Sequence, residues 1–434
     1  MNQPSGRDIQ LERIERGLSL GGLVLIAVTW PLWTPQDRFP RIALLESIAS
    51  LPDSVDASLT WIALGLCCAS LLGMSIFAHR KLVARWAAAI VALSFLVLVL
   101  LDQHRLQPWC IHISVCLLLA TWARPERRLD YLTWFTASIY VYSAIGKFDA
   151  QFLHTVGQDF VRSLLGSVGW NSELIDYRLR VWIAFGFPLF ELCAGLGLAW
   201  RPTRWLAAVA AIGMHIMLLW VLGPLGLDHA WGVLIWNSLF IVLNVMMFLW
   251  PGASDHSAAA TPAETLEPTS RAAARVGDRR GGLIELLLVC ALVVPAGERL
   301  GLVDHWLGWA LYAPHSSRVH IEIFESAVPR LPAAVQPFVQ CGSEPQSLWC
   351  VVRVDRWSLA TLGAPLTPQQ RFQIGVARAL LPLVDDHEIR ADILSTADRW
   401  TGRRKQHELR GSAELNAAAK QYWFNTTPRF DPID

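Results

Sequence analysis

Residues 180–223 contain two long apolar runs joined by a short basic turn, in the sequence RVWIAFGFPLFELCAGLGLAWRPTRWLAAVAAIGMHIMLLWVLG. Each run is close to the ~20 residues that an α-helix needs to cross the hydrocarbon core of a bilayer. Each run also holds one ionisable residue near its middle, Glu191 in the first and His215 in the second. This stretch therefore predicts a membrane-spanning helical hairpin with two buried polar side chains.

The composition of the whole chain agrees with that prediction. Hydrophobic residues make up 53% of the 434 residues and charged residues only 17%, whereas soluble proteins carry roughly 25% charged residues. The 21 tryptophans often stand at the ends of apolar runs, where membrane interfaces favour them. The net charge of +1 excludes a strongly electrostatic nucleic-acid binder. We therefore expect the chain to lie in a lipid bilayer and to bind no nucleic acid.

Apolar runs recur along the chain and predict an all-α polytopic membrane bundle of about nine transmembrane helices. They lie at residues 18–33, 57–77, 86–101, 109–122, 132–148, 180–200, 205–223, 231–250 and 283–298. We expect residues 1–250 to form a bundle of eight spans. A flexible cytoplasmic linker, rich in Ala, Thr, Pro and Ser, is expected at 251–281. The ninth helix is expected at 282–298, followed by a small extracytoplasmic α+β domain at 299–434.

The basic residues predict the orientation of these spans. Alternate loops on the side of the N-terminus carry 15 Lys and Arg residues, and the loops of the other side carry 7. Because basic loops stay in the cytoplasm, the N-terminus should be cytoplasmic and the C-terminal domain extracytoplasmic. Two outer loops, 36–50 and 158–167, mix apolar and charged residues and should lie along the outer membrane interface.

The C-terminal domain shows mixed periodicities. Residues 318–324 alternate as a strand does, and 348–354 form a second strand candidate. Residues 367–383 and 387–400 have helical patterns. Cys341 and Cys350 lie in an external, polar segment, where disulfides persist, so we expect a bridge between them; the alternative is a pair of free buried thiols. The six other cysteines lie in apolar runs and are interpreted as small apolar fillers.

A polar stripe marks the fifth apolar run. Its members are spaced 3, 4, 3 and 4 residues apart and share one helical face: Thr133, Thr136, Tyr140, Ser143 and Lys147. We expect this face to border the bundle interior or a cavity, with Lys147 at its outer mouth. Burial disfavours a charged amine, which makes a lysine usable as a base. Alternatively, Lys147 lies near a helix end and snorkels to the lipid headgroups.

Other polar residues inside the bundle are functional candidates because membrane burial of polar groups is costly. Counting helical rises places Glu191 and His215 at similar depth, so we expect a direct or water-bridged contact between them; a purely structural pair is the alternative. Asn237, on the eighth run, is either a ligand-binding group or helix-to-helix glue. The outer turn at 102–109 contributes Asp102, Arg105 and Gln107 as further candidates, or is a simple turn before Pro108.

The residues around Lys147 resemble a known family. The segment Tyr142-Ser143-Ala144-Ile145-Gly146-Lys147-Phe148-Asp149 is similar to the catalytic-lysine segment of vitamin K-dependent gamma-glutamyl carboxylase, within the HTTM (horizontally transferred transmembrane domain) superfamily. Glu191, the basic turn and His215 match in order and spacing. The stretch 102–109 resembles a motif in bacterial relatives, some of them DoxX-like. Two departures are Gly146, where the carboxylase has a second lysine, and a much smaller external domain.

The resemblance implies an enzyme of the bacterial inner membrane. Lys147 would be the catalytic base that deprotonates a reduced naphthoquinone or another quinol. Tyr140, Ser143, Glu191, His215, Asn237, Asp102, Arg105 and Gln107 would bind cofactor or substrate. The reaction would be proton abstraction and carboxylation of an unknown extracytoplasmic substrate, with no metal expected. The alternatives are a DoxX-like quinone-binding redox partner and a non-catalytic membrane module. A cavity beside Lys147 would favour the first two of these three hypotheses.

Overall fold

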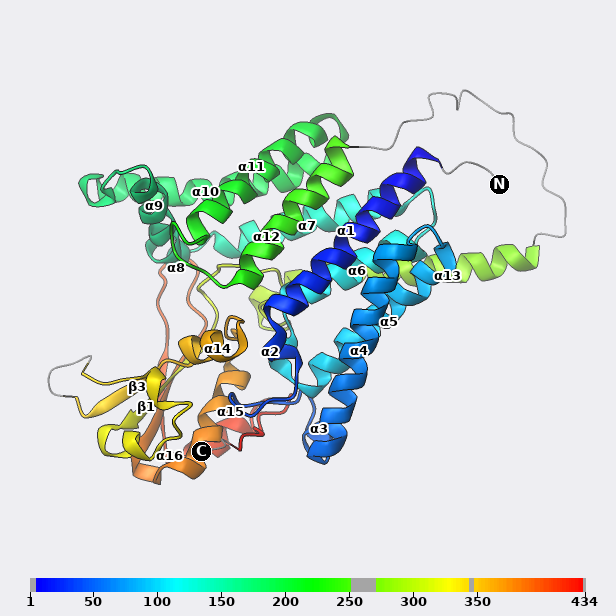
Figure 1. Cartoon of the computed structure of the whole chain (residues 1–434). Helices are drawn as coiled ribbons and strands as arrows, with labels where there is room; N and C mark the ends of the chain where they lie inside the picture. Colours follow the sequence, from blue (N-terminus) through cyan, green and yellow to red (C-terminus); the bar gives the residue numbers. More distant parts are fainter. Residues whose placement is uncertain (1–4, 251–270, 343–346, 432–434) are drawn as a thin grey trace.

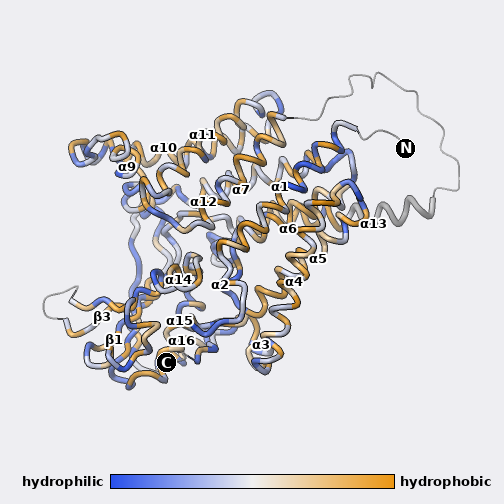
Figure 2. The backbone as a smooth tube through the Cα atoms, in the orientation of Figure 1, coloured by the Kyte–Doolittle hydropathy of each residue, from blue (hydrophilic) through white to orange (hydrophobic). Residues whose placement is uncertain are grey.

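The computed structural model describes residues 5–250, 271–342 and 347–431. Long helices form an extended bundle, and a smaller part with a β-sheet lies at the end of the bundle away from the N-terminus (Figure 1). The long helices consist mostly of hydrophobic residues, whereas hydrophilic residues are more frequent in the connections and in the C-terminal part (Figure 2). The expected combination of a helical bundle and a small α+β part is therefore present.

A helix of the bundle overlaps each of the nine apolar runs, with shifted ends. These helices are α1 (Gly6–Val28) with the short α2 (Trp30–Trp33), α4 (Asp53–Phe77), α5 (Lys81–Leu101), α6 (Pro108–Trp122), α7 (Arg128–Lys147), α10 (Tyr177–Ala199), α11 (Arg204–Leu222), α12 (Trp231–Asn244) and α13 (Arg271–Val293). Among the residues that the structure describes, five stretches are long and apolar enough to cross a membrane: Asp53–Phe77, Lys81–Leu101, Tyr177–Ala199, Arg201–Leu222 and Trp231–Leu249. These five identify the chain as a helical membrane protein.

Two boundaries differ from the sequence prediction. Helix α13 begins at Arg271, so residues 271–281 are helical and do not belong to a flexible linker; the rest of that predicted linker, 251–270, lies outside the described residues. The helix ends at Val293, and Pro295 follows in the 3-10 helix η6 (Val294–Leu300). Proline lacks the backbone N–H that an α-helix would need there, which explains why the α-helix ends before residue 298.

The two long loops take different forms. Residues 158–167 belong to α9 (Val156–Ser167), which follows the short α8 (Ala150–His154). Residues 36–50 contain only the one-turn helix α3 (Glu46–Ala49). Their backbone is held by the end of the chain, since Arg41 and Arg429 form an isolated antiparallel bridge and Arg429 donates to the carbonyl oxygens of Ile48, Ala49 and Leu51.

The C-terminal part is a five-stranded antiparallel sheet in the order β2-β3-β1-β4-β5. Its elements are β1 (Arg318–Phe324), β2 (Val339–Gln340), β3 (Trp349–Val352), α14 (Val354–Leu362), α15 (Gln370–Leu380), β4 (Ile389–Leu394), β5 (Gln406–Arg410) and α16 (Gly411–Ala419). The strands predicted at 318–324 and 348–354 and the helix predicted at 367–383 are confirmed. The helix predicted at 387–400 is wrong, because this segment pairs with β1 as strand β4.

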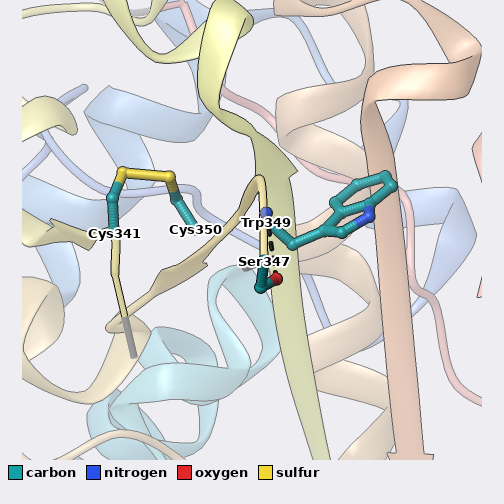
Figure 3. The surroundings of a disulfide bond; sticks show 4 residues. All are labelled: Cys341, Ser347, Trp349 and Cys350. Atoms are coloured by element: carbon teal, nitrogen blue, oxygen red, sulfur yellow. Dashed lines mark hydrogen bonds between the residues drawn. A yellow bond between two sulfur atoms is a disulfide. The ribbon is translucent and has the colours of Figure 1, made fainter. Parts of the chain in front are cut away.

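The expected disulfide is formed between Cys341 and Cys350. Cys350 lies on β3, where its side chain is buried, while the ring of its neighbour Trp349 points to the other side of the strand (Figure 3). The Arg390 guanidinium stacks over that ring at 4.4 Å from its centroid. The bridge therefore ties the start of β3 to the chain that follows β2.

Candidate functional site

A cavity of about 640 Å³ lies among α7, α10, α11 and α12. Its lining is dominated by apolar and aromatic side chains from these helices, among them Phe187, Phe190, Met214, Leu218, Trp236 and Phe240. The polar residues in the lining are few: Thr29, Gln107, Ser143, Lys147, Glu191, His215, His229, Asn237 and Tyr312. A mostly apolar hollow with a few convergent polar groups is typical of a small-molecule site.

Lys147 reaches the cavity from the last residue of α7. Its Nζ donates to the Ser143 hydroxyl at 2.7 Å and to Glu191 Oε2 at 2.6 Å. Side chains on a helix point back toward its N-terminus, so the ammonium lies about one turn, or ~5 Å, deeper than the Lys147 backbone. The residue stays 6% exposed and Glu191 9% exposed, which makes them a buried ion pair and not a lysine that snorkels to the surface.

His215 belongs to a second hydrogen-bonded group. Asn244 donates to the Tyr140 hydroxyl at 2.8 Å, so that hydroxyl is free to donate its own hydrogen to His215 Nε2 at 2.8 Å. His215 Nδ1 faces Asn237 Oδ1 at 2.9 Å, and the Asn237 amide nitrogen donates to the Val233 carbonyl. These partners fix a neutral imidazole with its hydrogen on Nδ1.

These contacts correct one predicted pairing. Glu191 is bonded to Lys147 and not to His215, whose ring nitrogens are both taken. The depth count compared Glu191 with His215 alone and did not consider the Lys147 side chain, which reaches back along α7 toward Glu191. The whole polar stripe of α7 is nevertheless buried, as predicted.

The three candidate residues in the turn at 102–107 have two different roles. Gln107 lines the cavity, but Asp102 and Arg105 do not appear in its lining. Asp102 caps the 3-10 turn η1 (Gln103–Arg105) by accepting from the His104 N–H. The Arg105 guanidinium donates to the Leu32 carbonyl at 2.9 Å and to the Thr60 hydroxyl at 3.3 Å. Arg105 thereby links α2 and α4 to the turn, and Asp102 holds the turn itself.

The chain beyond α13 closes one side of the cavity. Trp306, Leu311 and Tyr312 line it, together with Pro365. Tyr312 has a positive φ of 56°, a conformation that costs a non-glycine residue energy and persists only where surrounding packing imposes it. Sequence reasoning missed this wall because it depends on the chain folding back onto the bundle. The aromatic residues of 306–312, so soon after the last apolar run, are the only signal that could have indicated it.

Two hydrogen-bond donors at the cavity lack a protein acceptor within the described residues. The Lys147 ammonium has three N–H groups and its bonds to Ser143 and Glu191 use two. The Tyr312 hydroxyl is buried without a hydrogen-bond partner. Burial also raises the pKa of Tyr312, so its hydroxyl keeps its hydrogen. A ligand with oxygen acceptors would satisfy both donors, since a buried unpaired polar group is costly.

The cavity also reaches the outer surface of the bundle between α10 and α11. Gly186 on α10 and Gly213 on α11 line it, and both positions have open space where a side chain would stand. Phe190, also in the lining, is 46% exposed. Both helices belong to the candidate spans, so this opening, the lateral opening, faces the apolar surface that would contact lipid.

The apolar and aromatic walls, with a few hydrogen-bonding side chains, would suit a lipophilic ligand that carries polar groups. No family model, curated protein or solved structure matches this chain, so the resemblance to the HTTM superfamily and the roles that it implies stay predictions.

Proposed function

We propose that this chain is an integral membrane enzyme that binds a reduced naphthoquinone or similar lipophilic quinol and takes a proton from it with the Lys147–Glu191 pair. The carboxylase-like reaction implied by the resemblance follows from that step. The observation that carries the proposal is the buried pair at the wall of a large apolar cavity. If the ion pair were only structural, no cavity would be needed beside it. If Lys147 acted as a base alone, Glu191 would not be needed next to it.

The pair can act as one proton acceptor. At 2.6 Å, and away from water, the ion pair and the neutral amine–acid pair differ less in free energy than in solution, because the solvation that favours charges is lost. When Glu191 holds the shared proton, Lys147 presents a neutral amine to the cavity. Accepting one proton from the ligand then leaves an ammonium beside a neutral carboxylic acid.

The other groups position the ligand and exclude water. Ser143 holds the lysine side chain along α7, and the bonds to Tyr140 and Asn237 fix the His215 ring in the cavity wall. A quinol held in the cavity would supply the reactivity toward oxygen and the strong base that carboxylation requires. The aromatic walls and the 306–312 segment keep water from quenching reactive species. Ligand would enter from lipid through the lateral opening.

The DoxX-like alternative, a redox partner of an external thiol, has less support. No cysteine lines the cavity within the part of the chain that the structure describes. The one disulfide lies in the C-terminal sheet. Electrons passing between a quinone in the cavity and an external thiol would therefore find no cysteine beside Lys147 to carry them.

The proposal includes the topology expected from sequence, with nine spans, a cytoplasmic N-terminus and an extracytoplasmic C-terminal part in a bacterial inner membrane. In a cysteine-free background, Ala259→Cys should react only with reagent that enters the cytoplasm, and Thr401→Cys with impermeant reagent from outside. Labelling of both from one side would reject the orientation.

The enzymatic step is tested by oxygen-dependent consumption of a reduced naphthoquinone by the purified protein in lipid nanodiscs. Lys147→Arg keeps the charge but cannot become a neutral amine near neutral pH. It should lose roughly 100-fold or more in rate, the scale of general-base catalysis, with monodispersity preserved. Equal rates for the wild type and Lys147→Arg would reject the base role.

A further inference from the structure

Three side chains converge directly after α13, outside the cavity. Glu298 Oε1 lies 2.7 Å from His305 Nδ1 and 2.9 Å from His315 Nε2. The three donor atoms are within 4.8 Å of one another. The side chains are 10% exposed for Glu298, 6% for His305 and 1% for His315. This Glu298–His305–His315 cluster plays no part in the proton transfer proposed above.

The outer nitrogens of both rings face acceptors. His305 Nε2 lies 2.9 Å from the Ala313 carbonyl oxygen, which can only accept, so this nitrogen carries a hydrogen. His315 Nδ1 lies 3.1 Å from Asp149 Oδ2, off the ideal hydrogen-bond direction, and a carboxylate again favours a hydrogen there. If the rings are neutral, the inner nitrogens therefore turn lone pairs toward the Glu298 oxygen.

Two lone pairs and a carboxylate oxygen in such close contact repel one another. The repulsion is removed in one of two ways: each ring takes an extra proton, or one divalent cation binds between them. Both supply two positive charges, so the surrounding charges do not favour either. Those charges are the Asp149 carboxylate and Arg299, which contacts it at 3.1 Å and so neutralises it.

We propose that the cluster is a binding site for a divalent transition metal ion, best suited to Zn²⁺. Two imidazoles and one carboxylate are a common zinc ligand set, which leaves the fourth position to water. Histidine ligands in such sites give their other N–H to a carboxylate or a backbone carbonyl, which are the groups that face His315 and His305 here. With metal bonds of ~2.0–2.1 Å, tetrahedral ligands stand roughly 3.3 Å apart, so the side chains need to part by a few tenths of an ångström.

The backbone of this segment is shaped around the cluster. A Cβ at Gly308 would lie 2.3 Å from Glu298 Cβ and 2.5 Å from its Cγ, so only glycine lets the chain pass over Glu298. The same turn supplies Trp306, Leu311 and Tyr312 to the cavity wall. The bound ion would therefore hold together the segment that closes the cavity, and its role would be structural.

The test is metal binding by the full-length protein after removal of any affinity tag. The protein in nanodiscs is stripped with a chelator, titrated with Zn²⁺ by calorimetry and then assayed for metal content. We expect one tightly bound ion per chain and a higher unfolding temperature with Zn²⁺. His305→Gln and His315→Gln, which keep polar side chains of similar length, should weaken binding about 100-fold or more.

Two control variants separate this site from adventitious binding. Two exposed histidines serve as controls: His407 of β5, and His387, which lies near Asp385 and the buried Glu388. Each should be replaceable by Gln without loss of the tight site. Substoichiometric zinc in the wild type, or zinc retained at full affinity by both His305→Gln and His315→Gln, would overturn the proposal and assign the cluster to doubly protonated histidines. Metal content is independent of quinol turnover, so failure of one proposal leaves the other standing.

Discussion

Polar side chains gather at two places in the apolar bundle, in the turn at residues 102–107 and around Lys147 and Glu191. In the turn, Arg105 is 1% exposed, and its guanidinium donates to acceptors from α2, α4 and the chain after α2. Around Lys147, the polar atoms border a cavity and one N–H is left without an acceptor among the described residues. Both segments of the sequence are rich in polar residues and both were therefore named as candidate sites. Only the cavity beside Lys147 distinguishes a candidate ligand site from a structural joint.

The turn also joins the bundle to the C-terminal part. Gln103 donates to the Ala43 and Asn425 carbonyl oxygens and accepts from Arg371 at 2.7 Å. His104 lies 3.1 Å from the Ser358 hydroxyl, and burial lowers its pKa to about 4, so it stays neutral. In this joint the guanidinium groups of Arg105 and Arg371 are paired, although His104 Nδ1 is buried without a partner in the described part of the chain. Beside the cavity, by contrast, the charged Lys147 ammonium itself keeps one N–H without an acceptor among the described residues.

The largest expected effect on stability is at the joint. Arg105→Leu leaves the carbonyls of Leu32 and Thr34 unpaired in a buried place, at ~1–3 kcal/mol each, and removes a tightly packed side chain. We expect a loss of about 4 kcal/mol or more, seen as loss of the monodisperse peak on mild heating in detergent. Arg178→Leu, at an exposed position, is the control and should behave as wild type. Equal heat resistance of the two variants would contradict the structural role of Arg105.

The next effect concerns the Lys147–Glu191 pair. Lys147→Met or Glu191→Leu alone leaves a buried charge without its partner and should cost about 3 kcal/mol. The double variant removes both charges and should recover to within about 1 kcal/mol of wild type, because well-packed apolar replacements of buried pairs are often neutral. A double-mutant cycle of thermal unfolding measures this. If the two losses simply add, the two side chains are not coupled.

A smaller effect is expected from the disulfide. Its short loop stabilises by roughly 2–3 kcal/mol at most, and it lies in the sheet, away from the cavity. Cys341→Ser with Cys350→Ser should lower the unfolding temperature of the C-terminal part and leave ligand affinity unchanged. Peptide mapping without reductant should find the linked pair in the wild type. Two free thiols there would refute the bridge.

The smallest effect on stability is expected at the lateral opening. Gly213→Leu places a side chain in open space, and leucine favours a helix over glycine by ~1 kcal/mol, so the fold should be unharmed. Entry of a quinone from lipid should slow at least several-fold, as stopped-flow fluorescence would show. Gly65→Leu on α4, another helical position with open space but outside the cavity lining, is the matched control. Equal entry rates would place the entrance elsewhere.

Sequence periodicity predicted well what depends on one helix or strand at a time. The buried stripe on α7 follows from 3-4 spacing, and β1 was found because Val319, Ile321 and Ile323 alternate. The helix expected at 387–400 was wrong because pairing with β1 buries Ile389 and Ala391 on a strand, and such tertiary pairing overrides local propensity.

The site was predictable only in part, for the same physical reason. Lys147, Ser143, Glu191, His215, Asn237 and Gln107 were all named from sequence and all line the cavity. Which of them bond to each other depends on side-chain direction and helix packing, which spacing does not encode. Tyr312 and Trp306 came from a segment whose return to the bundle is set by contacts with residues far away in the chain.

The most direct test of the central claim is equilibrium binding of a naphthoquinone to the purified protein in nanodiscs. Trp109, Trp236 and Trp306 line the cavity, so a bound quinone should quench their fluorescence. The account predicts saturable quenching at one ligand per chain. It also predicts affinity at least tenfold weaker in the stable Lys147→Met, Glu191→Leu double variant, which has lost the polar contacts but kept the walls. Quenching that never saturates, or equal affinity in the double variant, would contradict a ligand site at this pair.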